Sequence, residues 1–198
     1  MRKLKAGLVV LMATALVAAI FGVGSQALFT DSAPVGSNTF DTGTLDITTS
    51  PTSAIWTAVT AGAPGDRATG PLTVNNAGSL QLRYAVTGSN TSSTLAGAMN
   101  LRIALRGGAS CDFPYHNTDG TNTTLTDDTQ LYSGLLSTAA LIGNNAQGNQ
   151  SGDRTLNGGA SENLCFGVVL PLSAGNTLQG LSNTTTFTFD AEQTSNNP

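Results

Sequence analysis

Apolar and polar residues alternate with a period of two in several short segments of this chain, and this pattern constrains the fold most strongly. In residues 100–107, NLRIALRG, Leu101, Ile103 and Leu105 share one face of an extended strand. Arg102 and Arg106 share the other face, so the pleat predicts that both arginines point to solvent and need no ligand.

Three further segments carry strand signals. Residues 71–88, PLTVNNAGSLQLRYAVTG, predict a hairpin with its turn at residues 75–78, Gln81 and Arg83 facing outward. Residues 163–172, NLCFGVVLPL, are continuously apolar and predict a central strand that ends at Pro171. Residues 184–193, TTTFTFDAEQ, predict the last core strand. The residues expected to face inward in these segments are Leu72, Val74, Leu80, Leu82, Tyr84, Val86, Phe187, Phe189 and Ala191.

Short strands separated by turn signals, in a chain rich in Thr, Ser, Asn and Gly, predict an all-β fold. The expected architecture is a two-sheet β-sandwich of the jelly-roll or immunoglobulin type, and periodicity alone does not choose between these topologies. Residues 127–143 favour a short helix with Asp127 or Asp128 as its N-cap. Residues 117–130 and 143–159 are expected to be polar surface loops.

The first 27 residues have the pattern of a secretory signal peptide. The positive MRKLK precedes an apolar run from Ala6 to Val23, and cleavage is expected between Ala27 and Leu28. A retained membrane anchor is the alternative, because the run is nearly long enough to span a bilayer. We therefore expect a secreted protein of the extracellular matrix or cell surface, with a signal peptide at 1–27, an N-terminal segment at 28–46 and one sandwich domain at 47–198.

The charge balance excludes one class of partner. Removal of residues 1–27 from the 198-residue chain leaves no lysine and five arginines against twelve acids, a net charge of −7. Such a chain has no electrostatic basis for binding phosphate backbones or anionic lipids. We expect no nucleic-acid partner.

Cys111 and Cys165 are the only cysteines in the sequence. In an exported protein, a disulfide between them is favoured over a metal pair or a reactive thiol.

The sequence offers no catalytic apparatus, so we assign no catalytic or metal residue and expect a protein that is not an enzyme. His116 is the single histidine, which leaves no HExxH motif and no two-histidine metal site. Residues 119–122 with Asp127 and Asp128 are the one candidate for calcium, but they lack the alternating acidic ladder of a calcium loop, and turn chemistry explains them equally. No other cofactor is expected.

Several blocks of the chain resemble the TasA and camelysin family of secreted proteins, whose leader is processed by a SipW-type signal peptidase. The similarity lies in residues 27–47, residues 63–86 and the last strand, and it is thin in the middle of the chain. Its most specific element is the combination of an aromatic-Thr-Asp step, an F-x-x-G-T-L-D block, a Pro-Gly-Asp turn and an N-x-G-S-L block. The motif residues are Phe29, Thr30, Asp31, Gly43, Thr44, Leu45, Asp46, Pro64, Gly65 and Asp66.

The resemblance implies a jelly-roll subunit of biofilm-matrix or cell-surface fibres that polymerises head to tail by donor-strand exchange, with an accessory anchor protein as a possible partner. The N-terminal strand of one copy would complete a sheet of the next, with Leu28, Phe29, Val35 and Phe40 filling pockets. Alternatively, that strand folds back onto its own sandwich.

Two other functions remain open on the sequence. A monomeric adhesin or a glycan- or protein-binding module would use the polar loops, although Trp56, the single tryptophan, is expected in the core. The family also includes metal-dependent proteases that cleave casein, but a chain with one histidine and no metal-ligand spacing departs from that chemistry.

Overall fold

The computed structural model describes residues 40–56, 62–106, 111 and 129–197. The chain separates into two compact units, residues 1–41 and residues 42–198. The predicted signal peptide and cleavage site, most of the N-terminal segment, His116 and the candidate calcium residues lie outside the described residues. The following description concerns the second unit.

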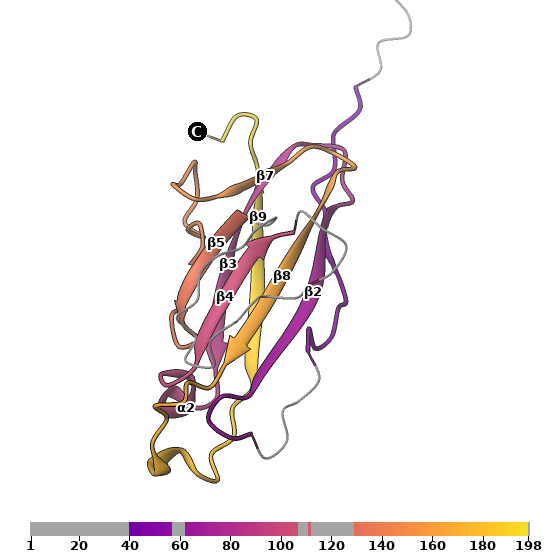
Figure 1. Cartoon of the computed structure of the whole chain (residues 1–198). Helices are drawn as coiled ribbons and strands as arrows, with labels where there is room; N and C mark the ends of the chain where they lie inside the picture. The colour runs from indigo at the N-terminus through magenta and orange to yellow at the C-terminus, as the bar shows by residue number, and fades with distance from the viewer. Residues whose placement is uncertain (1–39, 57–61, 107–110, 112–128, 198) are drawn as a thin grey trace, which may run out of the picture. The chain divides into compact units, whose positions relative to one another are not determined.

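The regular secondary structure described in the second unit is mostly antiparallel strand (Figure 1). The two helical elements, α2 and the 3-10 helix η1, are short. The elements are β1 Ile47–Ser50, β2 Arg67–Asn76, β3 Leu82–Asn90, α2 Ser93–Ala96, β4 Asn100–Leu105, β5 Thr129–Leu135, β6 Ala140–Ile142, β7 Arg154–Leu156, β8 Ser161–Val169, η1 Asn176–Leu178 and β9 Thr185–Gln193.

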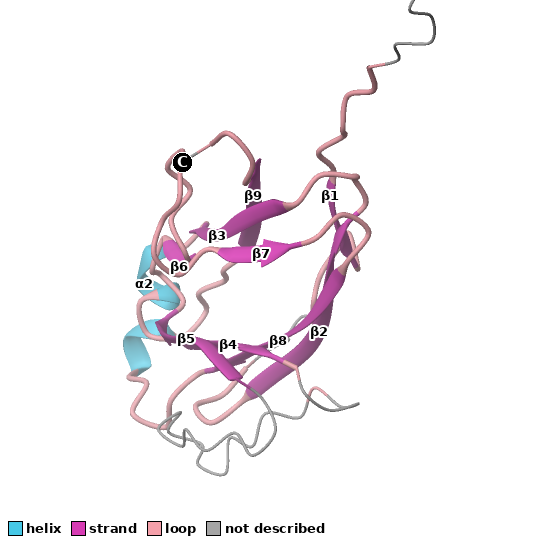
Figure 2. Ribbon diagram, turned by 90° about the horizontal axis from the view of Figure 1, so that it is seen from above, coloured by secondary structure: helices cyan, strands magenta, loops and turns pink. Residues whose placement is uncertain are grey.

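The strands form two sheets that pack face to face (Figure 2). The first sheet has the order β1-β2-β8-β4-β5, so β8 is its central strand, as the apolar run predicted. In the second sheet, β3 pairs with β9 along its whole length on one side and with β7 and β6 on the other. The predicted all-β sandwich is confirmed.

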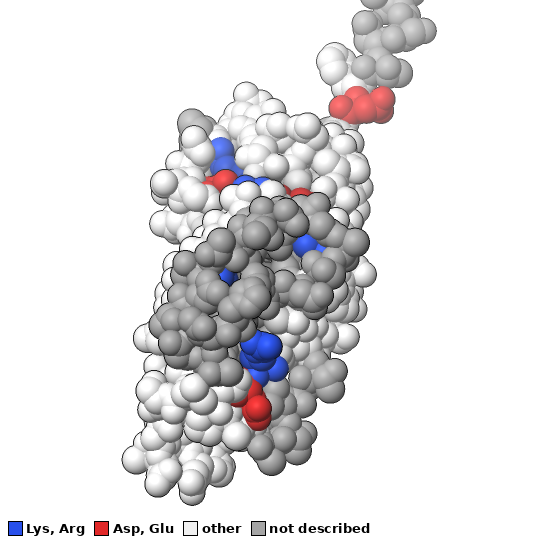
Figure 3. Space-filling model, viewed as in Figure 1, with Lys and Arg blue, Asp and Glu red and all other residues white. Residues whose placement is uncertain are grey.

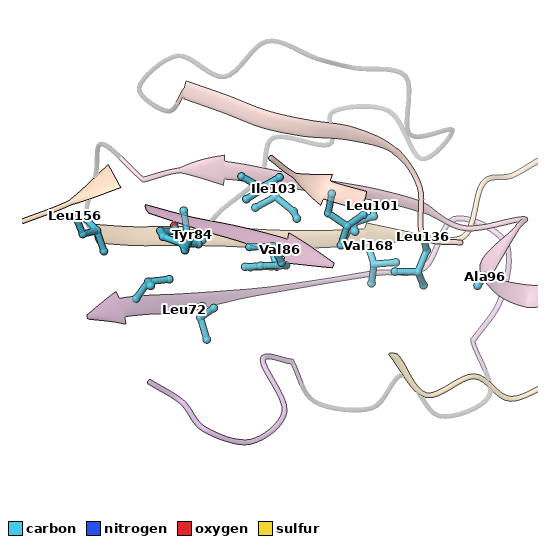
Figure 4. Close-up of a cluster of buried hydrophobic side chains, with 14 of the residues drawn as sticks. Leu72, Tyr84, Val86, Ala96, Leu101, Ile103, Leu136, Leu156 and Val168 are labelled. Carbon is cyan, nitrogen blue, oxygen red and sulfur yellow. The ribbon is translucent and has the colours of Figure 1, made fainter. Parts of the chain in front are cut away.

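The core lies between the sheets (Figure 4), where the inward residues of β3 meet those of β4 and β8. Aromatic rings join the layers: the Phe166 ring on β8 lies 4.9 Å from that of Phe187 on β9, between centroids. The Tyr84 ring lies 6.0 Å from that of Phe189. Trp56 packs edge-on against Phe187 at 5.8 Å, which confirms its predicted core position. Ring pairs at these separations are favourable beyond the area that they bury.

The predicted hairpin at residues 71–88 is wrong. β2 and β3 belong to different sheets, and residues 77–81 form a corner between them. Of the residues predicted to face inward here, Leu72, Val74, Leu82, Tyr84 and Val86 are buried, whereas Leu80 lies in the corner and is only half-buried. Alternation identifies the face of each strand but not the strand with which it pairs, since both sheets turn an apolar face to the same core.

The predicted helix at residues 127–143 is also wrong. Residues 129–135 form β5, which pairs with β4, and residues 140–142 form β6, which pairs with β3. Gly134 and the Ser and Thr residues lower helix propensity, and ladder bonds to two existing strands outweigh the remaining preference. The segment 143–159, expected to be a surface loop, contains the short strand β7.

The arginines predicted to be solvated are covered. Arg83 and Arg102 do point away from the core, yet only 6% and 2% of their surfaces are exposed, and Arg106 is half-buried. Arg102 donates to the Gln130 side chain at 2.6 Å on β5, and Arg83 pairs with Glu192 on β9. Figure 3 shows the face of the molecule seen in Figure 1, and the described residues expose few charged atoms there. No helix among the described residues is long and apolar enough to cross a membrane.

Candidate functional site

Two of the sequence blocks singled out above contact each other where the chain joins the sandwich. Residues 43–46, GTLD, lie against the corner between β2 and β3. The Ser79 and Leu80 amides donate to the Thr44 carbonyl at 3.0 and 3.1 Å, and the Ala77 amide donates to the Asp46 carbonyl at 2.8 Å. The Thr44 amide in turn donates to the Ser79 hydroxyl at 3.0 Å. The G-T-L-D and N-x-G-S-L blocks are therefore the two halves of one docking contact, which we call the docking corner (residues 43–46 and 76–80).

A glycine makes this contact possible. A Cβ at Gly78 would lie 2.3 Å from the Thr44 carbonyl oxygen, closer than real Cβ contacts come. Backbone can approach backbone here only because the side chain is absent.

Buried Asn76 organises the corner, a role that the sequence did not reveal. Its side-chain amide donates to the carbonyls of Leu80 at 2.7 Å and Leu156 at 3.1 Å, and its oxygen accepts from the Gly78 amide at 3.1 Å. The side chain thus binds backbone groups of the corner and of β7 at the same time. The Asn-Ala-Gly sequence indicated a turn, but only the folded chain brings Leu156 beside it.

The Pro-Gly-Asp block lies at the other end of β2 and takes no part in this contact. The Asp66 amide donates to the Ala63 carbonyl at 2.9 Å, the Ala63 amide donates to the Asp66 carboxylate at 2.7 Å, and Gly65 has a φ of +97°. The Gly65 amide also donates to the Leu170 carbonyl at 2.7 Å, which joins the start of β2 to the end of β8. This turn is a structural element of the first sheet.

One edge of the second sheet is open within the described part of the chain. β9 pairs only with β3 there, so its opposite side carries unpaired backbone groups. The Thr194 amide donates to the Gln81 carbonyl and the Thr91 amide to the Thr184 carbonyl, both at 3.1 Å. Even-numbered residues of β9 therefore point their N–H and C=O groups at β3, and odd-numbered residues point theirs at the open side.

The side chains along this edge are incompletely buried. Phe187, Phe189 and Ala191 face the core, but each remains partly exposed, unlike the fully buried core residues of β3 and β8. Within the described residues, the core is therefore only partly covered along β9, where Trp56 packs against Phe187.

Polar contacts hold the two sheets together near the docking corner. On β8, Glu162 accepts from the Tyr84 hydroxyl and from Arg154, each at 2.5 Å, and both donors belong to the second sheet. Burial, and then the hydrogen bond to Glu162, raises the pKa of Tyr84 far above its ordinary value, and the same carboxylate raises the pKa of Arg154. With a raised pKa, Tyr84 stays neutral and Arg154 stays positively charged at all physiological pH values.

A second cluster covers the outer face of the second sheet. Glu192 accepts from Arg83 Nε at 2.5 Å, from the Asn197 side chain at 2.8 Å and from the Gly148 amide at 2.9 Å. The hydrogen bond from Arg83 lowers the pKa of Glu192. A cavity of about 50 Å³ beside it is far smaller than the several hundred Å³ of a small-molecule site.

The disulfide prediction is confirmed. Cys111 and Cys165 are bonded, with their Cα atoms 5.4 Å apart. Cys165 lies on the outward face of β8, beside Ala104 and Val169.

The remaining predicted site residues do not form a chemical centre. Within the described ranges, no group of three or more His, Cys, Asp or Glu side chains is placed to hold a metal ion. Of the predicted donor residues, Phe40 is 95% exposed, and Leu28, Phe29 and Val35 lie outside the described residues, as do motif residues Phe29, Thr30 and Asp31.

These features define a class: an all-β sandwich with an open sheet edge and a chain that is bonded to the sandwich from residue 43 onward. The family model for the camelysin metallo-endopeptidases matches residues 1–197, and the chain belongs to this TasA/camelysin family. No curated protein matches the chain.

Proposed function

We propose that this protein is a secreted structural subunit that polymerises without covalent links into fibres of the biofilm matrix or cell surface. Signal cleavage after Ala27 would free residues 28–41, which we call the arm, to complete a sheet of a neighbouring copy. Membership of the TasA/camelysin family supports this proposal.

The observation that carries the proposal is the position at which the chain becomes part of the sandwich. The compact unit begins at Thr42, and the docking corner holds residues 43–46. The segment first expected to act as donor, residues 28–46, is therefore shortened to the arm, because residues 43–46 are already engaged in their own subunit. The edge of β9 that is open within the described residues could pair with such an added strand, because an exposed strand edge carries unpaired backbone groups.

The name of the camelysin metallo-endopeptidase family raises proteolysis as the second candidate. Metal-dependent hydrolysis needs three protein ligands and an open coordination position, and the described residues provide no such group. Casein cleavage by purified residues 28–198, abolished by a chelator, would favour this function over a structural one.

Electron microscopy of purified protein tests the proposal. Residues 28–198 should assemble into filaments, whereas residues 41–198, which lack Leu28 to Phe40, should remain soluble monomers. Filaments from the shorter form would overturn the donor-strand mechanism. A longer form that never polymerises but binds glycans on an array would favour a monomeric binding module instead.

A further inference from the structure

We propose that the open edge of β9 is the acceptor for the arm of the next copy, and that the arm binds antiparallel to β9 with Phe29, Ala33 and Val35 facing the core. This inference rests on the proposed function. It identifies the acceptor strand, the direction of the donor and the residues that it buries.

Within the described part of the chain, the outward backbone groups of β9 have no strand beside them. The N–H and C=O groups of Thr185, Phe187, Phe189, Ala191 and Gln193 point away from β3. The side chains of Phe189 and Ala191 are partly exposed at the margin of the core. An added strand would form hydrogen bonds with these backbone groups and would cover these two side chains, as in other cases of strand addition to an exposed edge.

Pro34 selects which residues of the arm bond to this edge. Proline has no N–H, so it is tolerated where its backbone faces away from the ladder. Pro34 is even-numbered, and odd-numbered arm residues therefore direct their N–H and C=O groups toward β9.

The direction of pairing then decides which arm side chains enter the core. In an antiparallel pair, bonded residues lie opposite each other and share a face. The bonding residues of β9 face the core, so the odd-numbered arm residues, including Phe29, Ala33 and Val35, would face it as well. In a parallel pair the faces are reversed, and Ser32, Pro34, Gly36 and Asn38 would face the core instead. Burial of the apolar set favours the antiparallel arrangement.

The attachment point of the arm shows that an antiparallel donor comes from another copy. β9 runs toward the docking corner, since Gln193 pairs with Leu82 and Thr194 bonds to Gln81. The arm joins its own sandwich at that same corner. If it folded back along its own β9 without reversing, it would run parallel. Antiparallel binding requires residue 41 to lie at the far end of the acceptor, near Thr185.

This geometry places the docking corner of one subunit against the opposite end of the next. The relation is head to tail and does not close, so it propagates as a filament. The acceptor's far end carries exposed leucines that suit such a contact: Leu172 and Leu181, in the connection between β8 and β9, are 58% and 42% exposed. Leu45, which belongs to the docking corner, is 44% exposed.

Small arm residues would lie where Trp56 packs against β9. Trp56 already covers Phe187, so little room remains near the start of β9. Ser37 and Thr39, the odd-numbered arm residues nearest to its attachment at residue 41, have small side chains.

The arm is also long enough to span the acceptor strand. Its fourteen residues reach about 46 Å when extended, which exceeds the roughly 30 Å length of the nine-residue β9.

Proline substitution at matched edge positions tests the acceptor. In residues 28–198, Ala191→Pro removes one outward N–H from β9 and leaves its bonds to β3 intact. Ser133→Pro makes the matched change on β5, which is an edge strand of the first sheet. The Leu136 amide donates to the Met99 carbonyl, so the even-numbered residues of this part of β5 point their backbone groups at β4 and the Ser133 N–H points outward. We expect A191P to lose filaments in electron micrographs while its circular dichroism remains that of a folded β protein, and S133P to polymerise as the parent does.

A pair of arm variants tests direction without touching the sandwich. Ala33→Asp would place a charge in the acceptor's core, whereas Ser32→Asp would place the same charge on the solvent face. We expect A33D to abolish filaments and S32D to retain them. The reverse result would overturn the antiparallel arrangement, and filaments from both variants would show that neither side chain is buried.

The outcomes separate the two proposals. If the parent and A191P both form filaments, fibre formation stands and β9 is not the acceptor. If A191P fails to fold, A33D and S32D still decide whether the odd-numbered face is buried. If the parent itself forms no filaments at any concentration, both proposals fail.

Discussion

At the scale of single residues, the corner where the chain changes sheets depends on the side-chain hydrogen bonds of Asn76 and on a close backbone contact at Gly78. Asn76 satisfies three backbone groups, and Gly78 allows the Thr44 carbonyl to approach. Neither residue contributes much apolar burial. Their importance comes from the cost of leaving buried backbone polar groups unpaired, on the order of 1–3 kcal/mol for each group.

Replacing Gly78 with alanine should therefore destabilise the sandwich. The added methyl would lie 2.3 Å from backbone rather than from a movable side chain, so the docking corner must open. We expect urea denaturation to show a loss of about 1–3 kcal/mol. Gly175→Ala is the matched control, because the nearest atom to its Cβ is the Thr177 hydroxyl oxygen at 4.0 Å. Equal stability of the two variants would contradict this account of the corner.

Protonation of Glu192 should lower the free energy of unfolding, so the stability of the sandwich should depend on pH. Its folded-state pKa lies below the ordinary value of 4.5, chiefly because Arg83 donates to it, so its contribution is present above that value and is lost as pH falls through the lowered pKa. We expect the midpoint of thermal unfolding to fall on acidification from about pH 5 to pH 3.

The variant Glu192→Gln should be less stable than the parent at pH 7, and the difference should shrink at pH 3. Asp41→Asn, which changes an exposed carboxylate outside the sandwich, is the control. A constant difference between parent and E192Q across this range would rule out the charge of Glu192 as the cause.

At the scale of elements, β8 and β9 differ in the number of strands with which they pair. β8 is bonded on both sides, to β2 and β4, and its outward face carries the disulfide. β9 has the same length but one bonded side in the described part of the chain. The long edge that it presents is the feature that makes this domain suited to accept another strand.

Removing the disulfide should weaken the domain measurably. The two cysteines are 54 residues apart, and releasing a loop of this size costs about 2–4 kcal/mol in the usual range. We expect the double variant Cys111→Ala/Cys165→Ala to unfold at lower urea concentration, and dithiothreitol to lower the stability of the parent but not of the variant. An unchanged midpoint would show that the first sheet alone secures β8.

At the scale of the whole molecule, the scarcity of charge sets how copies can associate. With five arginines against twelve acids after removal of residues 1–27, identical subunits repel one another weakly at long range. The proposed contact consists of backbone hydrogen bonds and apolar side chains, which salt does not screen.

Assembly should therefore tolerate salt. Raising sodium chloride from ~0.05 M to ~0.5 M shortens the screening length and should leave filaments intact while speeding their growth. Light scattering during assembly measures the rate, and electron microscopy measures the endpoint. Dissolution at high salt would indicate that ion pairs hold the subunits together.

The sequence by itself determined the class of fold, the inward face of most strands, the disulfide and the family. These properties are local or compositional. A period of two places Tyr84 and Val86 on one side of a strand whatever the strand pairs with, and in a chain with two cysteines each has a single possible partner within the chain.

Tertiary structure alone decided pairing. It separated β2 from β3, made residues 129–135 a strand, covered Arg83 and Arg102, and left β9 with an open edge. Each outcome depends on residues distant in the chain, such as Leu156 beside Asn76 or Glu192 beside Arg83. Nearly every residue carries the same backbone N–H and C=O groups, so these groups do not identify which two strands will pair. The packing of side chains in the folded molecule decides the pairing.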